Sequence, residues 1–324
     1  MEETSLCCPP FDPALQYAIG FPGASNKLDL DSSRQNLSES NAAAVIATHP
    51  HLVHTEYKIP ALSDLDSNNI TLSIFESKDS TSRNRVALYY VHGGGQITGN
   101  RFFGLDDPIK YFGDIDAVFV SVEYRLAPEH QAPAGAYDSY AGLVYIADHS
   151  ADLGIDPSKI LLYGFSGGAA PALGSAILSR NRKHPPIHAQ ILSAPMLDDC
   201  VDTVSAKQFA VGSMWSAEHN CMAWDMVLGP DRGMPGVDEL RAPSRASDLS
   251  GLPPTFIDVG ECEVFRDEAV AFASKIWKSG GTAELHVWPG LYHGAFLCEP
   301  DVPVSKAAAD AQKTYIKRVF APLS

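Results

Sequence analysis

The stretch KILLYGFSGGAAPAL, from Lys159 to Leu173, decides the fold. Residues 160–163 are the β-branched, apolar and aromatic types that favour a buried strand. A Gly-Phe-Ser-Gly-Gly turn follows directly, and residues 167–180 have a helical pattern. Pro171 fits the first turn of that helix, where its missing N–H loses no hydrogen bond. The stretch therefore predicts a strand, a tight turn and a helix in immediate succession.

The serine of this turn lies in a Gly-x-Ser-x-Gly pattern formed by Gly164, Ser166 and Gly168. The pattern alone also fits a glycine-rich turn with a surface serine. Between a strand and a helix it has a steric reason, because the serine is strained and a Cβ on either glycine would collide with a neighbouring element. Ligands bind beyond the carboxyl ends of parallel strands. The context therefore favours Ser166 as a nucleophile.

Short β-branched or aromatic runs alternate with helical patterns along the chain, as in repeated βα units. The predicted strands are residues 86–91, 117–122, 160–163, 189–193, 255–259 and 284–288. The predicted helices are residues 136–149, 167–180, 267–278 and about 304–320. Several strands are apolar on both faces, which indicates a mainly parallel sheet covered by helices on each side. Residues 55–77 predict an antiparallel pair in which Thr71, Ser73 and Phe75 alternate with Leu72 and Ile74.

We expect one domain over residues 1–324, because α/β folds of this length are often single domains. Two regions break the alternation, residues 1 to about 50 and about 200–245, and we expect them to form a lid over the sheet edge. The second region holds a set of large apolar side chains that could be lid core or ligand wall: Phe209, Met214, Trp215, Met222, Trp224 and Met226.

Composition excludes several classes of partner. The net charge of −15, with 24 Lys and Arg, argues against nucleic-acid binding. No apolar run approaches the ~20 residues of a membrane span, and the acidic, proline-broken start of the chain does not resemble a signal peptide, so we expect a cytoplasmic protein. The six cysteines show no CxxC or metal-like spacing, which predicts free thiols and no metal site.

A serine nucleophile needs a base, and that base needs an orienting acid, in the chain order serine, acid, histidine. His293 is the best placed of eleven histidines, five residues past the last strand in PGLYHGAF, whereas His286 lies inside that strand. Glu263 follows the strand 255–259 by four residues and is the preferred acid. Glu261 is an alternative, and Asp267 is expected to cap the next helix.

A glycine run, His92-Gly93-Gly94-Gly95, ends the strand 86–91. Its bare N–H groups can bind the oxyanion that forms when a carbonyl is attacked. We expect Gly94, Gly95 and Gly167 to supply these donors. A phosphate-binding loop is the rival interpretation, but neither Lys-Ser/Thr nor G-x-G-x-x-G follows.

Together these motifs, with EYRLAPEHQAPAGAYD at residues 123–138, VGECEVFRDEA and PGLYHGAF, resemble the hormone-sensitive-lipase-like branch of the α/β-hydrolase superfamily. The resemblance covers roughly residues 86–296. It implies an α/β-hydrolase fold, with a mostly parallel eight-stranded sheet, helices on both faces and a helical lid, and ester hydrolysis without a cofactor. It also implies Ser166 as nucleophile, Glu263 as acid, His293 as base, and Gly94, Gly95 and Gly167 as oxyanion donors.

The sequence departs from the family pattern at three positions. Phe165 stands where an acidic residue is usual, Glu263 replaces the commoner Asp, and Gln96 stands where an aromatic residue is frequent. Gln96 would make the acyl side of the pocket more polar. We expect substrate contacts from Gln96, Phe165, Met214 and Trp215. In YRLAPEH we expect Arg125 and Glu129 to pair within the scaffold.

The sequence thus predicts a serine carboxylesterase that cleaves small to medium carboxylic esters through an acyl-enzyme. One alternative is a cyclase or eliminase on the same fold, acting on a natural-product pathway intermediate. A second is a non-catalytic small-molecule receptor, although such receptors on this scaffold have lost the catalytic histidine. The expected partner is a small-molecule ester, and a homodimer is left open.

Overall fold

An eight-stranded sheet forms the centre of the computed structural model, which describes residues 6–17, 28–37 and 39–321. The sheet order is β1-β2-β4-β3-β5-β6-β7-β8. The strands are β1 (Leu52–Pro60), β2 (Asn69–Ser77), β3 (Arg85–Val91), β4 (Ala117–Glu123), β5 (Ile155–Phe165), β6 (Ala189–Ser193), β7 (Thr255–Cys262) and β8 (Ala283–Tyr292). Strands β3 to β8 run parallel, and β2 pairs antiparallel with both β1 and β4. The predicted fold class is confirmed.

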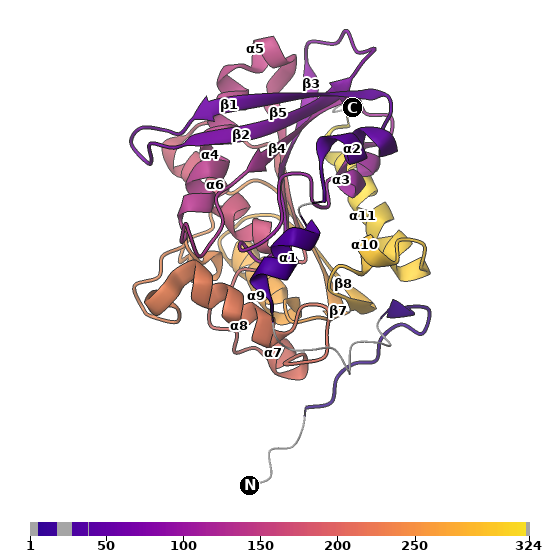
Figure 1. Cartoon of the computed structure of the whole chain (residues 1–324), viewed down its shortest axis with the longest axis vertical. Coiled ribbons are helices and arrows are strands. Elements are labelled where there is room, and N and C mark those ends of the chain that lie inside the picture. The colour runs from indigo at the N-terminus through magenta and orange to yellow at the C-terminus, as the bar shows by residue number, and fades with distance from the viewer. Residues whose placement is uncertain (1–5, 18–27, 38, 322–324) are drawn as a thin grey trace.

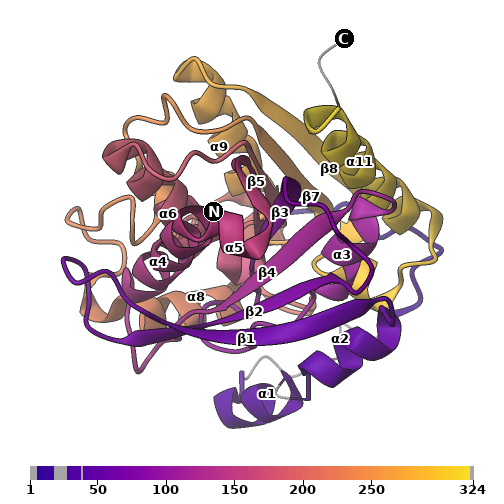
Figure 2. The ribbon, with the colours of Figure 1, turned by 90° about the horizontal axis from the view of Figure 1, so that it is seen from above.

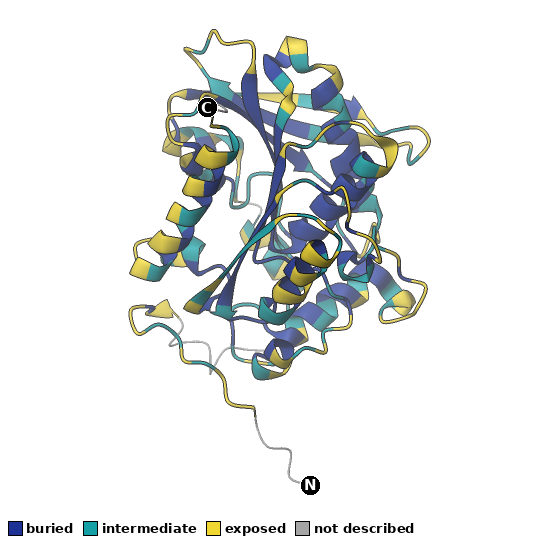
Figure 3. Cartoon of the chain, turned by 180° about the vertical axis from the view of Figure 1, so that it is seen from behind, coloured by how far each residue is buried: buried dark blue, intermediate teal, exposed yellow. Residues whose placement is uncertain are grey.

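Helices cover both faces of the sheet, and each face has its own apolar core. One face carries α4 (Ala134–Asp148), α5 (Ser150–Leu153), α6 (Ala169–Arg182) and α9 (Arg266–Lys278). The other carries α2 (Ala42–Thr48), α3 (Asp106–Phe112) and α11 (Pro303–Val319) (Figure 2). The central strands are therefore buried on both sides, as Figure 3 shows in dark blue, and every residue of β3 is buried, whereas the edge strands β1 and β8 are partly exposed.

The antiparallel pair β1 and β2 forms as predicted, and Leu72 and Ile74 lie on the opposite face from Phe75, as the predicted alternation requires. Ser73 and Phe75 are as buried as Leu72 and Ile74. The reason is that β2 is covered on both faces. Leu72 and Ile74 belong to the core under α4 and α6, whereas Phe75 packs in the opposite core with Val45 of α2.

Several strands are longer than the sequence predicts. β5 begins at Ile155 rather than at residue 160, β7 continues to Cys262, and β8 continues to Tyr292. After a register shift near Gly260, Cys262 pairs directly with Tyr292. The residues that follow these two strand ends therefore emerge beside each other.

The two regions set apart by the sequence contribute elements outside the sheet. They are α1 (Leu30–Leu37), α2, α7 (Val204–Gln208), α8 (Ala217–Leu228) and the short 3₁₀ turns η3 (Gly229–Asp231) and η4 (Pro243–Arg245). Figure 1 shows α7 and α8 at the end of the molecule opposite α5, which immediately precedes β5. Residues 1–5, 18–27 and 38 of the predicted lid lie outside the described residues.

The cysteine side chains are in the state that their spacing in the sequence predicts. All six cysteines are free, which confirms the predicted absence of disulfide bonds. Across residues 6–17, 28–37 and 39–321, no helix has the length and apolar character needed to cross a bilayer.

Candidate active site

Ser166 occupies the turn between β5 and α6, which opens with the 3₁₀ turn η2 (Ser166–Gly168). Its φ of 52° lies in the left-handed region, which is costly for a residue with a side chain. A Cβ on Gly164 would lie 2.7 Å from the Cα of Ala169, and one on Gly168 would lie 2.3 Å from the carbonyl oxygen of His92. Because these two glycines have no Cβ, β3, β5 and α6 can pack closely against one another next to the strained serine.

Three side chains form a continuous hydrogen-bond chain at this turn. Ser166 Oγ lies 3.0 Å from Nε2 of His293, and Nδ1 of the same ring lies 2.5 Å from Oε2 of Glu263. The second oxygen of Glu263 accepts the backbone N–H of Gly260 at 2.6 Å. All three side chains belong to buried residues. The geometry allows a proton to pass from the hydroxyl to an imidazole that a carboxylate orients.

The sheet register explains why these residues meet. Glu263 and His293 each follow directly after the paired ends of β7 and β8, rather than four and five residues past the strand ends as the sequence predicts. Phe265 contacts the imidazole edge to face, with ring centroids 5.1 Å apart, and Phe165 lies parallel to it at 6.0 Å. The ring orientation is therefore fixed by packing as well as by hydrogen bonds.

The rival carboxylates have other partners. Glu261 accepts the backbone N–H of Gly290 at 3.0 Å. Asp267 accepts the backbone N–H of Ser205 at 2.7 Å instead of capping α9. Asp258 is buried inside β7, and burial raises its pKa to about 6. Of the candidate acids, Glu263 is the one that contacts the imidazole.

The glycine loop after β3 approaches the start of α6. Gly94 and Gly95 have φ values of 111° and 62°, which favour glycine. A Cβ on Gly167 would lie 2.4 Å from the backbone nitrogen of Gly95 and 2.6 Å from that of Gln96. Glycine at this position therefore lets the backbone N–H groups of the loop approach the first turn of the helix beside Ser166.

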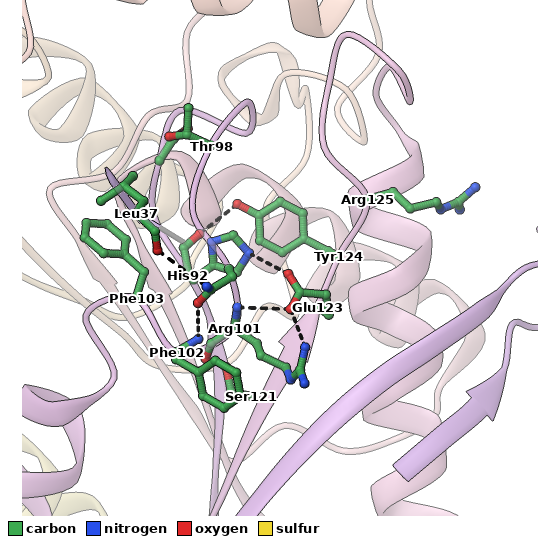
Figure 4. Close-up of polar contacts among 12 residues, drawn as sticks. Leu37, His92, Thr98, Arg101, Phe102, Phe103, Ser121, Glu123, Tyr124 and Arg125 are labelled. Atoms are coloured by element: carbon green, nitrogen blue, oxygen red, sulfur yellow. Dashed lines mark hydrogen bonds and ion pairs between the residues drawn. The ribbon is translucent and has the colours of Figure 1, made fainter. Parts of the chain in front are cut away.

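A buried cluster supports this loop from beneath (Figure 4). His92 Nδ1 lies 2.8 Å from the carbonyl oxygen of Gly93, and Tyr124 donates its hydroxyl to the carbonyl of His92 at 2.8 Å while stacking on the ring. Burial lowers the pKa of His92, so its imidazole is neutral at physiological pH. Glu123, paired with Arg101 at 2.6 Å, lies 4.0 Å from the other ring nitrogen. Sequence reasoning missed this supporting role of His92 and Tyr124.

A cavity of about 540 Å³ opens in front of Ser166. Phe165, Met214 and Trp215 line it, at three of the four positions expected to contact substrate. A Cβ on Gly95 would lie 2.6 Å from the Trp215 ring, so the indole covers the glycine loop. The large side chains of residues 200–245 therefore fall into two groups. Met214 and Trp215 line the cavity, whereas Phe209 and Trp224 are buried in the protein.

Gln96 is not among the residues that line the cavity. Its φ of 64° lies in the left-handed region, and its side chain is buried in the protein. Its carbonyl accepts the backbone N–H of Ala127 at 2.9 Å. The structure therefore places the Gln96 side chain in the protein interior rather than among the described lining residues, and its contact with substrate stays a prediction.

One side of the cavity comes from α1 and the two residues before it, which we call the α1 wall. Its members that face the cavity are Leu28, Asp29, Ser32, Ser33, Asn36 and Leu37. Other lining residues outside the predicted set are Phe103, His219, Leu297 and Cys298. Sequence reasoning missed all of these as cavity residues. The polar members on α1 form no motif, and the others come from separate segments that only the fold brings together.

Arg34 attaches the α1 wall to the protein. Its guanidinium contacts both carboxylate oxygens of Glu129, at 2.7 and 2.8 Å, and donates to the carbonyl oxygens of Ile97 and Ala127 at 2.8 Å each. Hydrogen bonds from Arg34 lower the pKa of Glu129 to about 2. The α1 wall is thereby joined both to the loop after the glycines and to the YRLAPEH segment.

The expected pairing of Arg125 with Glu129 is wrong. Arg125 instead pairs with Asp138 of α4 at 2.8 Å and with Asp66 at 2.5 Å. Asp138 is almost fully buried and also accepts the backbone N–H of Arg125. Arg125 therefore fixes the segment to α4, and Glu129 remains available to Arg34.

The fold, the strained serine between β5 and α6 and the glycine loop together are typical of α/β hydrolases, and comparison with protein families leads to the same class. Residues 88–297 match the family described as alpha/beta hydrolase fold, which is more than half of the chain. The chain therefore belongs to this family, and the resemblance drawn from its motifs is confirmed.

Among characterised proteins, the chain is similar to several esterases. A solved structure described as "Bacterial Heroin Esterase" is 31% identical, with a TM-score of 0.85, and the match covers 96% of this chain and 98% of that one. "Carboxylesterase NlhH" of Mycobacterium tuberculosis is 29% identical over 345 residues, covering 99% of each chain. "Esterase LipI" of the same species is 32% identical over 240 residues, covering 69% of this chain and 70% of its own.

Proposed function

We propose that this protein hydrolyses carboxylic esters with Ser166 as nucleophile, His293 as general base and Glu263 as the orienting acid. The chain is a carboxylesterase, as its family and its esterase relatives indicate. The observation that supports the residue roles is the hydrogen-bond chain from the Ser166 hydroxyl through His293 to Glu263. A serine hydroxyl is a poor nucleophile alone, and this chain supplies the base that activates it.

In the first half of the proposed reaction, Oγ of Ser166 attacks the ester carbonyl carbon while Nε2 of His293 accepts the hydroxyl proton. The tetrahedral intermediate collapses as His293 gives that proton to the departing alcohol. The acyl group stays on Ser166. In the second half, the same imidazole removes a proton from water, which attacks the acyl-enzyme. The bond between the acyl carbon and Oγ of Ser166 then breaks as the imidazolium returns that proton to Oγ, which releases the acid.

The backbone N–H groups of Gly94, Gly95 and Gly167 are the proposed oxyanion donors. Their positions beside Ser166, and the close approach of the loop to the first turn of α6, support this assignment. Such donors stabilise charge that develops only in the transition state, and losing one costs about 10²–10³ in kcat. Glu263, held by the N–H of Gly260, would keep Nδ1–H of His293 in place and stabilise the imidazolium.

The cavity supports small to medium esters as substrates. Its volume of about 540 Å³ lies within the ~300–1,000 Å³ range of small-molecule sites. We further propose that residues 1–50 and 200–245 act as a lid on a single α/β-hydrolase domain. The contributions of α1, Met214 and Trp215 to the cavity support this division.

Two assays test the function. The protein should hydrolyse p-nitrophenyl butyrate and should be labelled once, at Ser166, by a fluorophosphonate, as mapped by peptide mass spectrometry. A dedicated cyclase or a receptor would turn over this ester poorly or not at all. Labelling at another residue, or no hydrolysis of any simple ester, would refute the proposal.

A cytoplasmic location and a homodimer remain predictions for this protein. The partner class that its family supports is a small-molecule ester. Cell fractionation tests the location, and light scattering at several protein concentrations tests the oligomeric state. A monomer at every concentration would contradict the homodimer.

A further inference from the structure

The charges that line the cavity are unbalanced. Asp29 is the one acidic residue among the described lining residues, and none of these is a lysine or an arginine. Asp29 accepts hydrogen bonds from the backbone N–H and the hydroxyl of Ser32, at 3.3 and 2.6 Å. These bonds lower the pKa of Asp29, so its carboxylate is ionised at any pH at which the enzyme is assayed.

The nearest basic residue on the same helix does not offset this charge. Arg34 gives its guanidinium to Glu129 and to two backbone carbonyls, so its positive charge is already paired with another carboxylate. The remaining titratable groups around the cavity are His219, His293 and Cys298. A substrate in the cavity therefore meets one fixed negative charge and no fixed positive charge among the described lining residues.

The rest of the cavity suits a molecule with one polar end. Hydroxyl and amide groups of Ser32, Ser33 and Asn36 lie on the α1 wall with Asp29. Much of the remaining lining is apolar or aromatic, from Phe103, Phe165, Met214, Trp215 and Leu297. The whole chain has a net charge of −15, which raises the local concentration of cations and lowers that of anions.

We propose that this enzyme prefers esters that carry a positively charged amine or ammonium group, and that Asp29 on the α1 wall recognises the cation. The proposal rests on the esterase function proposed above and names the substrate class of the same site. Because the carboxylate is exposed to solvent, the preference is moderate and falls mainly on KM rather than on kcat.

Three acetate esters of similar size test the preference. Acetylcholine carries a cation, 3,3-dimethylbutyl acetate is its uncharged isostere, and 4-acetoxybutanoate carries an anion. We expect kcat/KM to fall in that order at low ionic strength, by about two- to fivefold at each step. At about 1 M salt the Debye length is only about 3 Å, and the differences should shrink. Equal rates for the cationic and the neutral ester would overturn the proposal.

The variant Asp29→Asn tests the residue. Asparagine caps a helix about as well as aspartate does, so the variant removes the charge and keeps the start of α1. It should lose most of the preference, measured as the ratio of kcat/KM for acetylcholine to kcat/KM for 3,3-dimethylbutyl acetate. An unchanged preference would overturn the assignment of the cation to Asp29.

Asp31→Asn is the matched control, because Asp31 lies in the first turn of the same helix and is not a lining residue. It should keep the preference. If it lost as much as Asp29→Asn, the general field of the protein would replace Asp29 as the cause. Failure to hydrolyse even p-nitrophenyl butyrate would refute the esterase function itself, which separates that outcome from a failure of the charge preference alone.

Discussion

The floor of the cavity and its α1 wall are built from different kinds of sequence. On the floor, Ser166, Glu263 and His293 each follow directly after the buried end of a strand, and the sheet register sets their distances. The α1 wall consists of an eight-residue helix with no buried member and the two residues before it. It is held in place by Arg34 and by a contact from Asn100 to the carbonyl of Leu37.

This difference separates two tasks. The proposed catalytic floor tolerates little change, because its glycines are in contact with backbone atoms and its serine is strained. The wall has only to present side chains to the cavity, and its exposed residues have room to differ. Substitutions on the floor should therefore change kcat, and those on the wall should change KM and substrate preference.

Ser166→Ala is the most severe test of the floor. Without the nucleophile, kcat for p-nitrophenyl butyrate should fall by about 10⁴-fold or more, measured on purified protein with an unchanged circular dichroism spectrum. Ser175→Ala on α6 is the matched control, because the hydroxyl of Ser175 contacts only the helix carbonyl of Ala172 among the described residues. Activity of Ser166→Ala close to that of the control would end the proposed mechanism.

Glu263→Gln should lower kcat by about 10²–10⁴-fold, because the amide cannot stabilise the imidazolium and can favour the wrong tautomer of His293. KM should change little. The control is Asp258→Asn, which removes a nearby buried carboxyl, inside β7, that contacts Gln312 and not the imidazole. Equal losses in the two variants would show that β7 requires buried carboxylates for stability rather than for catalysis.

Gly167→Ala tests the approach of the glycine loop to α6. The new Cβ would lie 2.4 Å from the backbone nitrogen of Gly95, so the loop must move away from Ser166. We expect kcat to fall by about 10²-fold, the effect of losing an oxyanion donor. Gly236→Ala adds the same methyl group where nothing lies within 4 Å and should be silent. Full activity of Gly167→Ala would exclude this donor arrangement.

Arg34→Met should have the smallest effect and should act on the wall. Loss of the contacts to Glu129 and two carbonyls frees α1, and we expect KM to rise by about two- to fivefold with kcat nearly unchanged. Arg182→Met removes a comparable surface pair, with Asp64, and is the control. A fall in kcat without a change in KM would show that Arg34 acts on the proposed catalytic residues of the floor rather than on the α1 wall.

The pH dependence of this contact has a definite sign. The pKa of Glu129 is about 2 in the folded protein, below its usual value of about 4.3. The pairing with Arg34 is thus fully present above about pH 4 and is lost as the pH falls toward 2. The difference in KM between wild type and Arg34→Met should therefore stay constant from pH 8 to about pH 5.

Much of the floor could be predicted from the sequence, because each of its parts imposes a local steric demand. Glycines at 164, 168 and 94–95 are needed for close approach or positive φ, and such demands leave short readable patterns. The predicted strands and helices are found with shifted ends, since β7 and β8 gain residues by pairing with each other after a register shift. That pairing depends on tertiary contacts that local sequence does not contain.

The wall could not be predicted in the same way. Nothing in residues 28–37 distinguishes a cavity-facing helix from any polar surface helix, and its position depends on Arg34 reaching Glu129, 95 residues further along the chain. The wrong pairing of Arg125 with Glu129 came from their closeness in sequence. Burial of Asp138 beside Arg125 decided the actual partner.

The segment from Glu123 to Glu129 serves both halves of the site at once. Tyr124 supports the glycine loop, the N–H of Ala127 holds Gln96, and the carbonyl of Ala127 and the carboxylate of Glu129 hold Arg34. The contacts that hold Arg34 and those that support the glycine loop therefore come from the same short segment. Efforts to retune selectivity should accordingly exchange the side chains at Ser32, Ser33 and Asn36 and leave this common support untouched.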